Sequence, residues 1–266
     1  MSTAKDIALI TGASTGIGAT YADRLARRGY DLVLVARDGA RMEALAQRLH
    51  AETGVSVDVI AADLTADADV AKVEARLAKG DITLLVNNAG MSLNGSLLEN
   101  DAAAYARIIA LNITAPTRLA GAAAKAFVAK GAGSIVNVAS VLALAPEIFD
   151  GIYSGTKAYI LNLSQAMTAQ LSDKGIYTQA VLPGATRTEI WERSGKDVDA
   201  LPDDFVMEAG DLVDAALTGF DRREAVTIPP LADESLWIAH QQTRAAMGPH
   251  LSKSQPAPRY RETVAL

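Results

Sequence analysis

Short apolar segments rich in β-branched residues recur along the chain, separated by longer segments of helical period. Nearly continuous apolar runs of this kind are typical of buried strands in a parallel sheet. The pattern predicts strands at residues 7–11, 31–36, 55–63, 82–88, 134–140, 177–183 and 225–230. Apolar positions at helical spacing predict helices at 17–28, 39–53, 67–79, 102–129, 153–173 and 208–220.

The regular alternation of strands and helices favours one fold class. Parallel strands need crossover connections, and these are right-handed, so the alternation predicts a doubly wound, Rossmann-like α/β fold. We expect a seven-stranded parallel sheet with helices on both faces. A chain of 266 residues can form one such domain with a large core, and no internal repeat or Gly/Ser linker divides it. We therefore expect a single domain over residues 1–266.

Two segments interrupt the alternation. Residues 185–207 are polar, charged and irregular. A segment of this kind after a strand often forms a mobile lid over a site, and an ordinary surface loop is the alternative. From about residue 231 we expect a C-terminal extension with one helical stretch at 233–247 and an extended or frayed end.

Composition and charge exclude several classes of function. The net charge is −6, and no block of Lys and Arg points to nucleic acid or an anionic membrane as a partner. The chain has no cysteine and its three histidines are scattered, so we predict neither a disulfide nor a metal site. No window reaches the ~20 apolar residues of a membrane span, and the N-terminus lacks signal-peptide features. These observations favour a cytoplasmic protein.

A turn with three glycines, TGASTGIG at residues 11–18, joins the first predicted strand to the first helix. Glycines allow the backbone to approach a phosphate closely, and a helix N-terminus offers free N–H groups and a partial positive charge. The spacing differs from G-x-G-x-x-G, so the general dinucleotide motif is not strictly matched. A tight turn with small residues for helix packing is the alternative.

The end of the second predicted strand, Val35-Ala36-Arg37, bears on the choice of cofactor. In dinucleotide-binding folds an acidic residue here accepts the ribose hydroxyls of NAD, whereas an arginine suits the 2′-phosphate of NADP. Ala36 has no carboxylate to repel a phosphate, and Arg37 can contact one through two N–H groups. Asp38 follows directly and weakens this argument, and Thr15 adds no second positive charge. We expect NADP(H) to be preferred, with NAD(H) as the alternative cofactor. The alternative for Arg37 is that its side chain is solvated and binds no cofactor.

Further motifs follow the glycine turn along the chain. They are TGASTGIG (11–18), Asp63, NNAG (87–90), Asn112, Ser140, Tyr153-x3-Lys157 and Pro183-Gly184. In this order and spacing, over roughly residues 5–230, the chain resembles the compact members of the short-chain dehydrogenase/reductase family. The resemblance implies a nicotinamide cofactor, hydride transfer to or from a carbonyl carbon, and a homodimer or homotetramer formed largely through the helices at 102–129 and 153–173.

The resemblance also implies which residues bind the cofactor. They are Gly12, Ser14, Thr15, Gly16, Ile17, Gly18, Arg37, Asp63, Leu64, Asn88, Ala89, Gly90, Tyr153, Lys157, Pro183 and Gly184. A threonine on the nicotinamide side is implied as well, and either Thr186 or Thr188 fits that pattern. The implied substrate is a small ketone, aldehyde or secondary alcohol.

Tyr153 and Lys157 lie four residues apart at the start of a predicted helix, and this spacing places them on one face. A reductase must protonate the carbonyl oxygen as hydride reaches the carbon, and a phenol can do so if its pKa falls from ~10 toward neutrality. An ammonium about 6 Å away would lower that pKa by about two units at an effective dielectric of ~20. We expect Tyr153 to be the proton donor in reduction and the acceptor in oxidation. By the resemblance, Lys157 also holds the nicotinamide ribose; a lysine stem that merely covers the ring is the alternative.

Two further residues complete the expected catalytic set. Ser140 follows the fifth predicted strand, where open α/β sheets bind ligands, and its hydroxyl can donate to the substrate oxygen. Asn112 is a polar residue within an apolar helical segment, and the resemblance implies that it holds a water in a proton relay from Lys157. Pro116 nearby is compatible with a local kink. The alternative for Ser140 is a helix or turn cap, and the alternative for Asn112 is an ordinary surface position.

Apolar residues in the loop at 141–152 and in the lid predict an apolar substrate pocket. They are Val141, Leu142, Leu144, Ile148, Phe149, Ile190 and Trp191. They favour an apolar ketone or aldehyde, although a subunit interface could use the same residues. An NAD-dependent alcohol dehydrogenase and a non-catalytic nucleotide-binding regulator are the alternative functions. Arg37 argues against the first, and Ser140 with Tyr153 argues against the second, because a binding protein needs neither side chain.

Overall fold

The computed structural model describes residues 5–95, 97–148, 150–195 and 197–261. The chain forms two compact units, Met1–Pro230 and Leu231–Leu266. The boundary between them lies where the sequence predicts the start of a C-terminal extension.

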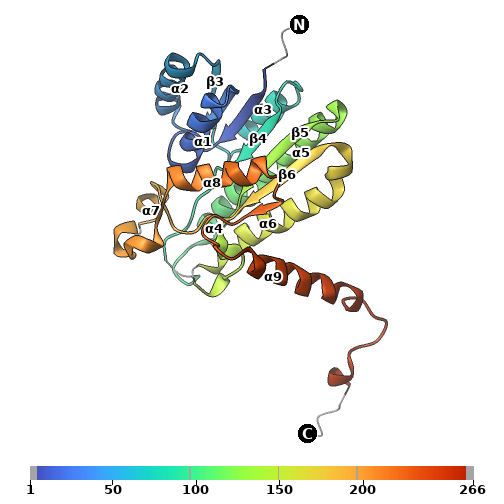
Figure 1. The fold of residues 1–266 in the computed structure, drawn as a ribbon. Helices are drawn as coiled ribbons and strands as arrows, with labels where there is room; N and C mark the ends of the chain where they lie inside the picture. Colours follow the sequence, from blue (N-terminus) through green and yellow to red (C-terminus); the bar gives the residue numbers. More distant parts are fainter. Residues whose placement is uncertain (1–4, 96, 149, 196, 262–266) are drawn as a thin grey trace. The chain divides into compact units, whose positions relative to one another are not determined.

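The first unit is built on a parallel sheet of seven strands in the order β3-β2-β1-β4-β5-β6-β9 (Figure 1). The strands are β1 Ile7–Thr11, β2 Asp31–Ala36, β3 Val57–Ala61, β4 Leu84–Asn87, β5 Gly133–Val138, β6 Ile176–Val181 and β9 Val226–Thr227. The chain runs outward from β1 to β3 and then crosses back to β4, so the strand order reverses between β1 and β4. Open α/β sheets bind their ligands outside the carboxyl ends of the strands at such a reversal. The predicted fold class is confirmed.

Helices cover both faces of the sheet and form a separate hydrophobic core on each (Figure 1). On one face lie α1 Gly16–Arg27, α2 Gly39–Thr53 and α8 Ala209–Asp221; on the other lie α3 Asp67–Leu77, α5 Ala115–Lys130 and α6 Gly151–Leu171. Leu9 and Ile10 are both fully buried but enter different cores, because successive strand side chains point to opposite faces. This two-sided burial explains why the strands are continuously apolar in sequence.

The predicted helix at 102–129 is interrupted. It consists of α4 Ala102–Ile109, a π-helical turn at Ala110–Thr114 and α5, which begins beside Pro116. Proline lacks an N–H and disfavours a regular helical bond at this point, and π-helical turns often occur at functional sites. The kink expected near Pro116 is therefore a π-helical turn, and it contains Asn112.

The segment at 185–207 has more structure than the sequence predicts. Its ends come together, because β7 Thr186–Arg187 pairs in parallel with β8 Met207–Glu208. Between them lie the short helix α7 Ile190–Arg193 and two 3-10 turns, Val198–Ala200 and Asp203–Phe205. The Arg187 guanidinium binds the carboxylates of Asp199 and Glu208. Backbone pairing and these ion pairs therefore tie the ends of the segment together, and we keep the name lid for residues 185–207.

The second unit contains one long helix, α9 Glu234–Met247, close to the helical stretch that the sequence predicts. Two 3-10 turns follow, at Gly248–His250 and Pro258–Tyr260. No residue of α9 is buried, and Leu236, Met247 and Leu251 are 60%, 49% and 76% exposed. Residues 262–266, the last part of the predicted frayed end, lie outside the described residues.

None of the helices in the described part of the chain is long and apolar enough to cross a membrane. Within the same residues, no group of three or more His, Cys, Asp or Glu side chains could hold a metal ion.

Candidate active site

The glycine turn at the end of β1 is shaped by contacts that leave no room for side chains. A Cβ on Gly18 would lie 2.2 Å from the Gly12 carbonyl oxygen, and a Cβ on Gly12 would lie 2.8 Å from Asn88 Nδ2. Gly12 and Gly16 also have positive φ angles of 68° and 54°. The intervening Ser14 and Thr15 are partly exposed, and Ile17 packs on the core beneath α1. The turn thus presents bare backbone and the N-terminus of α1, which suit a pyrophosphate.

The NNAG motif supports this turn from β4. Asn88 Nδ2 donates to the Thr11 carbonyl oxygen at 2.9 Å. The Thr11 hydroxyl accepts from the backbone N–H groups of Asn88 and Ala89, both at 3.0 Å. Thr11 was absent from the predicted site residues, although it is the first residue of the glycine motif. Its buried hydroxyl fixes the distance between the two loops.

The end of β2 presents a guanidinium without a partner. Arg37 is exposed, and its side chain makes no hydrogen bond or ion pair within residues 5–95, 97–148, 150–195 and 197–261. Asp38, which weakens the sequence argument for NADP, is the N-cap of α2 and accepts from the Arg41 N–H at 3.0 Å. Its carboxylate also lies 3.4 Å from Arg41 Nε. Asp38 is therefore engaged by its own helix.

Asp63 and Leu64 follow β3 as the sequence expects, but the Asp63 carboxylate has a structural role. Its Oδ1 accepts from the N–H of Thr65 at 3.0 Å and from the Thr65 hydroxyl at 2.8 Å. The Asp63 N–H donates to Asp69 in α3. Leu64 is buried in the core on the α3 side of the sheet. These bonds fix the loop after β3.

The two lid threonines have different surroundings. Thr186 is buried, and its hydroxyl donates to the Gly184 carbonyl oxygen at 3.1 Å. A Cβ on Gly16 would lie 3.0 Å from the Thr188 methyl carbon, so Thr188 lies against the glycine turn. Pro183 is buried at the end of β6 and its carbonyl oxygen accepts from the Val141 N–H at 2.9 Å. Of the two candidates, Thr188 is the one beside the phosphate-binding backbone.

The start of α6 positions Tyr153 and Lys157. Asp150 caps the helix by accepting from the N–H groups of Ile152 and Tyr153, so the helix begins at Gly151. Lys157 Nζ then lies 5.6 Å from the centre of the Tyr153 ring and donates to the Val138 carbonyl oxygen at 3.0 Å. The same-face prediction for Tyr153 and Lys157 is consistent with this distance.

Burial controls the ionisation of both groups. Burial raises the pKa of Tyr153 to about 12, while a hydrogen bond with Ser140 acts in the opposite direction. Burial lowers the pKa of Lys157 to about 8. The prediction that Lys157 brings Tyr153 toward neutrality is therefore wrong for the chain on its own. Loss of water penalises the charged form of each group more than their mutual attraction favours it.

Ser140 lies directly beyond β5, beside the start of α6. Its side chain is buried, and its hydroxyl oxygen accepts from the Leu142 N–H at 3.1 Å. The hydroxyl lies 3.5 Å from the Pro183 carbonyl oxygen, and the Ser140–Tyr153 hydrogen bond brings it to the phenol. The hydroxyl and the phenol thus converge on the same point, as a shared carbonyl oxygen would require.

Asn112 is buried and its side-chain amide is occupied by protein partners. Its Oδ1 accepts from the Met91 N–H at 2.9 Å, and its Nδ2 donates to the Met91 carbonyl oxygen at 2.8 Å and to Thr156 Oγ1 at 3.1 Å. A Cβ on Gly90 would lie 3.4 Å from both Asn112 Oδ1 and Lys157 Nζ. Asn112 therefore holds the NNAG loop beside Lys157. Met91 and Thr156 were not predicted as site residues.

The residues of the expected substrate segments differ in how far they are buried. Met91, Ile152 and Tyr153 pack on a small apolar cluster formed by Leu93, Ala104 and Ile108. In the loop after Ser140, Leu144 and Ile148 are exposed, and Phe149 lies outside the described residues. Val141 and Leu142 of the same loop are partly buried, and so are Ile190 and Trp191 in the lid. Trp191 Nε1 donates to the Thr186 carbonyl oxygen at 2.8 Å, which fixes the indole to the lid backbone.

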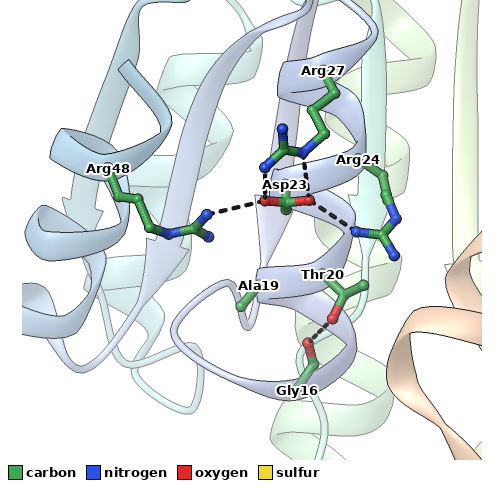
Figure 2. A pocket seen from close by; sticks show the side chains of 7 residues that line it. All are labelled: Gly16, Ala19, Thr20, Asp23, Arg24, Arg27 and Arg48. Atoms are coloured by element: carbon green, nitrogen blue, oxygen red, sulfur yellow. Dashed lines mark hydrogen bonds and ion pairs between the residues drawn. The ribbon is translucent and has the colours of Figure 1, made fainter. Parts of the chain in front are cut away.

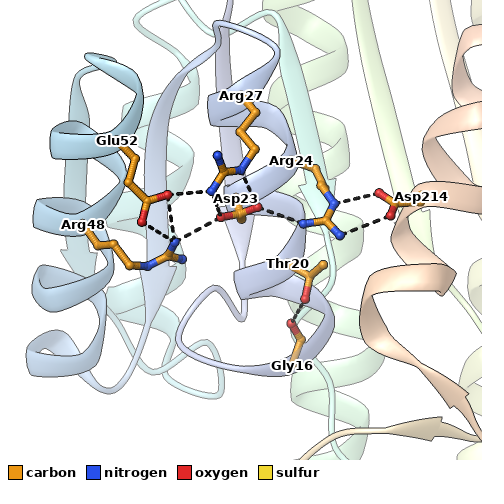
Figure 3. A network of polar contacts seen from close by, with 8 residues as sticks. All are labelled: Gly16, Thr20, Asp23, Arg24, Arg27, Arg48, Glu52 and Asp214. Atoms are coloured by element: carbon orange, nitrogen blue, oxygen red, sulfur yellow. Dashed lines mark hydrogen bonds and ion pairs between the residues drawn. The ribbon is translucent and has the colours of Figure 1, made fainter.

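A polar network on α1 lies outside the catalytic centre. The Asp23 carboxylate accepts hydrogen bonds from Arg24, Arg27 and Arg48, at 2.9, 3.1 and 3.2 Å (Figure 2). Arg24 continues to Asp214 of α8, at 2.7 and 3.1 Å (Figure 3). Burial alone would raise the pKa of Asp23, but the hydrogen bonds from Arg27, Arg24 and Arg48 hold it below its usual value. The network braces α1, whose N-terminus forms the glycine turn, against α2 and α8.

Comparisons with known proteins agree with this site. Residues 6–199 match the family model described as short chain dehydrogenase. A short-chain dehydrogenase from Sphingobium yanoikuyae, solved in complex with NADPH, is 55% identical with a TM-score of 0.93, and the match covers 96% of this chain and 100% of that chain. The bulky-bulky ketone specific alcohol dehydrogenase from Comamonas testosteroni is 50% identical with a TM-score of 0.90, covering 97% of this chain and 100% of that chain.

A more distant relative is 17-beta-hydroxysteroid dehydrogenase type 3 from Homo sapiens. It is 33% identical over 205 residues, which are 76% of this chain and 66% of the human enzyme. The match thus spans about two thirds of the human enzyme's length. Together with the glycine turn and the Ser140, Tyr153 and Lys157 arrangement, these matches confirm the predictions of an oxidoreductase and of a nicotinamide dinucleotide cofactor. The chain belongs to the short-chain dehydrogenase family.

Proposed function

We propose that this protein is an NADPH-dependent reductase of bulky, apolar ketones, which also oxidises the corresponding secondary alcohols. The observation that carries the proposal is the convergence of the Ser140 hydroxyl, the Tyr153 phenol and the Lys157 ammonium beside a glycine turn. A protein that only bound a nucleotide would need the turn but not the serine and the phenol.

The chain offers a fitting site for the cofactor. The backbone around Gly12 and Gly18 is so close that a Cβ on either would collide, which leaves N–H groups available to a pyrophosphate. In this proposal Lys157 holds the nicotinamide ribose, and Thr188, which lies against the glycine turn at Gly16, contacts the bound cofactor. When bound, NADPH supplies the hydride that reduces the carbonyl carbon.

The protein's own residues move the proton. Tyr153 donates its phenolic proton to the substrate oxygen, which is a far stronger base as the alkoxide forms than a phenolate is. The raised pKa of Tyr153 keeps the phenol protonated, which is the form that reduction needs. Ser140 donates a hydrogen bond to the same oxygen and stabilises its developing charge. The Lys157 ammonium stabilises the phenolate that remains, and Asn112 holds the Gly90–Met91 loop against Lys157 as a positioning residue.

The preference for NADPH rests on Arg37. Its guanidinium has no partner within the described parts of the chain, and Ala36 presents no carboxylate to the 2′ position. A 2′-phosphate would supply two acceptor oxygens for that guanidinium. The NADPH complex of the Sphingobium yanoikuyae relative supports this choice. An NAD-dependent alcohol dehydrogenase is the alternative that loss of Arg37 would distinguish.

The substrate class follows from the lining of the site. Leu144, Ile148 and Trp191 provide apolar surface, and Arg187 is engaged with Asp199 and Glu208 instead of serving a substrate anion. The Comamonas testosteroni relative, which carries the words bulky-bulky ketone specific in its description, supports a ketone with two large substituents. A small or charged carbonyl compound would leave this surface unfilled or unmatched.

The proposal includes self-association and a cytoplasmic location. Leu236 and Met247 of α9 are 60% and 49% exposed, and a helix of 14 residues with no buried side chain gains little stability alone. A second copy of this chain is the partner that we propose for it, as a homodimer or homotetramer. No nucleic acid or membrane is part of the proposal.

The experiment measures NADPH consumption by the purified protein with a series of uncharged ketones whose two substituents increase in size. A dialkyl ketone with one methyl group, an aryl methyl ketone and a diaryl or fused-ring ketone form a suitable series. We expect kcat/KM to rise along the series. Turnover confined to sugars, acyl thioesters or charged carbonyl compounds would overturn the substrate class, and NADPH binding without turnover on any carbonyl compound would overturn the reductase.

A further inference from the structure

An ion pair joins the lid to the start of α2. The Arg41 guanidinium donates to both oxygens of Glu189, at 2.8 and 2.9 Å, although the two residues are 148 positions apart in the chain. Both side chains are partly exposed, at 50% and 37%. Arg41 belongs to α2, and Glu189 directly precedes α7 of the lid. The pair therefore bridges two elements that, among the described residues, no backbone hydrogen bond connects.

Arg41 lies next to the proposed 2′-phosphate site. Its backbone N–H and its Nε both contact Asp38, the residue that directly follows Arg37. The end of β2 is itself joined to the glycine turn, because the Gly12 N–H donates to the Val35 carbonyl oxygen at 2.8 Å. Arg37 and Arg41 thus both lie in the connection from β2 to the first turn of α2, beside the phosphate-binding backbone. Among the described residues the Arg37 guanidinium has no partner, whereas the Arg41 guanidinium is occupied by a lid carboxylate.

The lid residue before Glu189 lies on the glycine turn itself. The Thr188 methyl carbon is 3.0 Å from where a Cβ on Gly16 would lie. The lid is therefore held at both the glycine turn and α2 by two neighbouring residues. A ligand that released Glu189 from Arg41 would therefore loosen the lid directly beside its contact with the glycine turn.

We propose that Glu189 is a cofactor-discriminating residue that competes with the 2′-phosphate of NADP(H) for Arg41. On binding, the phosphate takes the place of the Glu189 carboxylate on the guanidinium, so Arg41 joins Arg37 in holding the phosphate. NAD(H) has only a hydroxyl there and leaves the Arg41–Glu189 pair intact. The lid is thereby released at α2 by the phosphorylated cofactor alone. This inference rests on the proposed preference for NADPH but not on the proposed substrate.

The charges favour the exchange. A phosphate monoester carries between about one and a half and two negative charges at pH 7, compared with one for Glu189. An exposed ion pair contributes little, so its loss does not prevent the exchange. While Glu189 remains in place, its charge also repels the phosphate. Both effects predict that Glu189 weakens the binding of NADP(H) and leaves that of NAD(H) unchanged.

The test is calorimetric binding of NADP+ and NAD+ to full-length variants without substrate, so that no turnover enters the readout. Glu189→Gln should tighten NADP+ binding about two- to fivefold, the range expected for losing an exposed ion pair, with NAD+ affinity unchanged. Arg41→Ala should weaken NADP+ binding by roughly tenfold and leave NAD+ binding unchanged. In the Arg41→Ala background, Glu189→Gln should have a smaller effect than in the parent, because the competition for Arg41 is gone and only the repulsion between the Glu189 charge and the phosphate is left to relieve.

Glu208→Gln is the matched control, because Glu208, which directly follows the lid in β8, is also a carboxylate paired with an arginine, here Arg187 of the lid. It should leave the ratio of NADP+ to NAD+ affinity unchanged. An unchanged ratio in Glu189→Gln, the same change in Glu208→Gln, or an additive effect in the double variant would overturn the inference. A protein that binds NADP+ as described but reduces no ketone would contradict the proposed reaction and leave this inference standing.

Discussion

Lys157 Nζ lies 5.6 Å from the centre of the Tyr153 ring while donating to the Val138 carbonyl oxygen. Both side chains belong to the first two turns of α6, and the hydrogen bond to Val138 at the end of β5 fixes the position of the ammonium. Burial raises the pKa of Tyr153 to about 12 and lowers that of Lys157 to about 8. The site thus holds a protonated phenol beside a lysine that can change its charge near neutral pH.

The pH dependence of reduction follows from Lys157. Its ammonium form, which stabilises the phenolate left by Tyr153, predominates below its pKa of about 8 and is lost above it. We expect kcat/KM for ketone reduction to be constant near neutrality and to fall about tenfold per pH unit well above pH 8. Steady-state rates between pH 6 and pH 10 at saturating NADPH check this. A flat profile to pH 10 would contradict the role of the Lys157 charge.

Removing the Arg37 side chain should affect one cofactor only. In Arg37→Ala the 2′-phosphate loses a charge-assisted contact, so NADPH affinity should fall about tenfold or more while NADH affinity changes less than about twofold. Titration of the purified variant with each cofactor measures both values. Equal losses for the two cofactors would show that Arg37 does not read the 2′ position.

The Asp23 network predicts a pH-dependent loss of stability. Because its arginine partners lower the folded-state pKa of Asp23, the carboxylate stabilises the fold above its unfolded pKa, and this stability is lost as the pH falls through the folded value. Asp23→Asn should lower the free energy of unfolding by about 2 kcal/mol at pH 7, with a smaller difference below about pH 4.

Denaturant unfolding at both pH values measures this difference for Asp23. Glu43→Gln, an exposed carboxylate on α2, is the control and should change the free energy of unfolding by less than about 0.5 kcal/mol. A difference between Asp23→Asn and the parent that stays constant down to pH 3 would rule out the linkage.

The proposed self-association can be tested on α9. Leu236 and Met247 are eleven residues apart, about three helical turns, and so share one face, with Ala245 on the opposite side. We expect the parent to have a mass of two or four chains by light scattering. Leu236→Gln with Met247→Gln should shift the distribution toward smaller species, because glutamine keeps the helix but removes apolar contact area. Ala245→Gln should not. A monomeric parent would refute the proposal.

Much of the fold could be predicted because local pattern and burial agree. The strands at 7–11 and 31–36 have the predicted bounds, since both have a neighbouring strand on each side and are buried on both faces. The π-helical turn at Ala110–Thr114 was missed as such because its residues continue the helical periodicity. Pro116 indicates a kink at this point, but no local pattern encodes the bonding of Asn112 to Met91 that accompanies the turn.

The candidate site was predicted in part. The motif residues converge because the strand ends that carry them meet at one edge of the sheet. The Arg41–Glu189 pair and the bond from Thr156 to Asn112 join residues 148 and 44 positions apart, and a single sequence gives no signal for either. The direction of the Tyr153 pKa was wrong because the sequence shows the neighbouring charge but not the burial of both groups.

The most direct test of the central claim is to compare the parent with Tyr153→Phe on a ketone that the parent reduces, while measuring NADPH binding to both. The substitution removes only the phenolic oxygen, so the fold and the glycine turn should be retained. We expect NADPH affinity to stay within about threefold, and kcat to fall by about a hundredfold or more, as the loss of a general acid requires. Turnover in Tyr153→Phe close to that of the parent would contradict the assignment of Tyr153 as the proton donor.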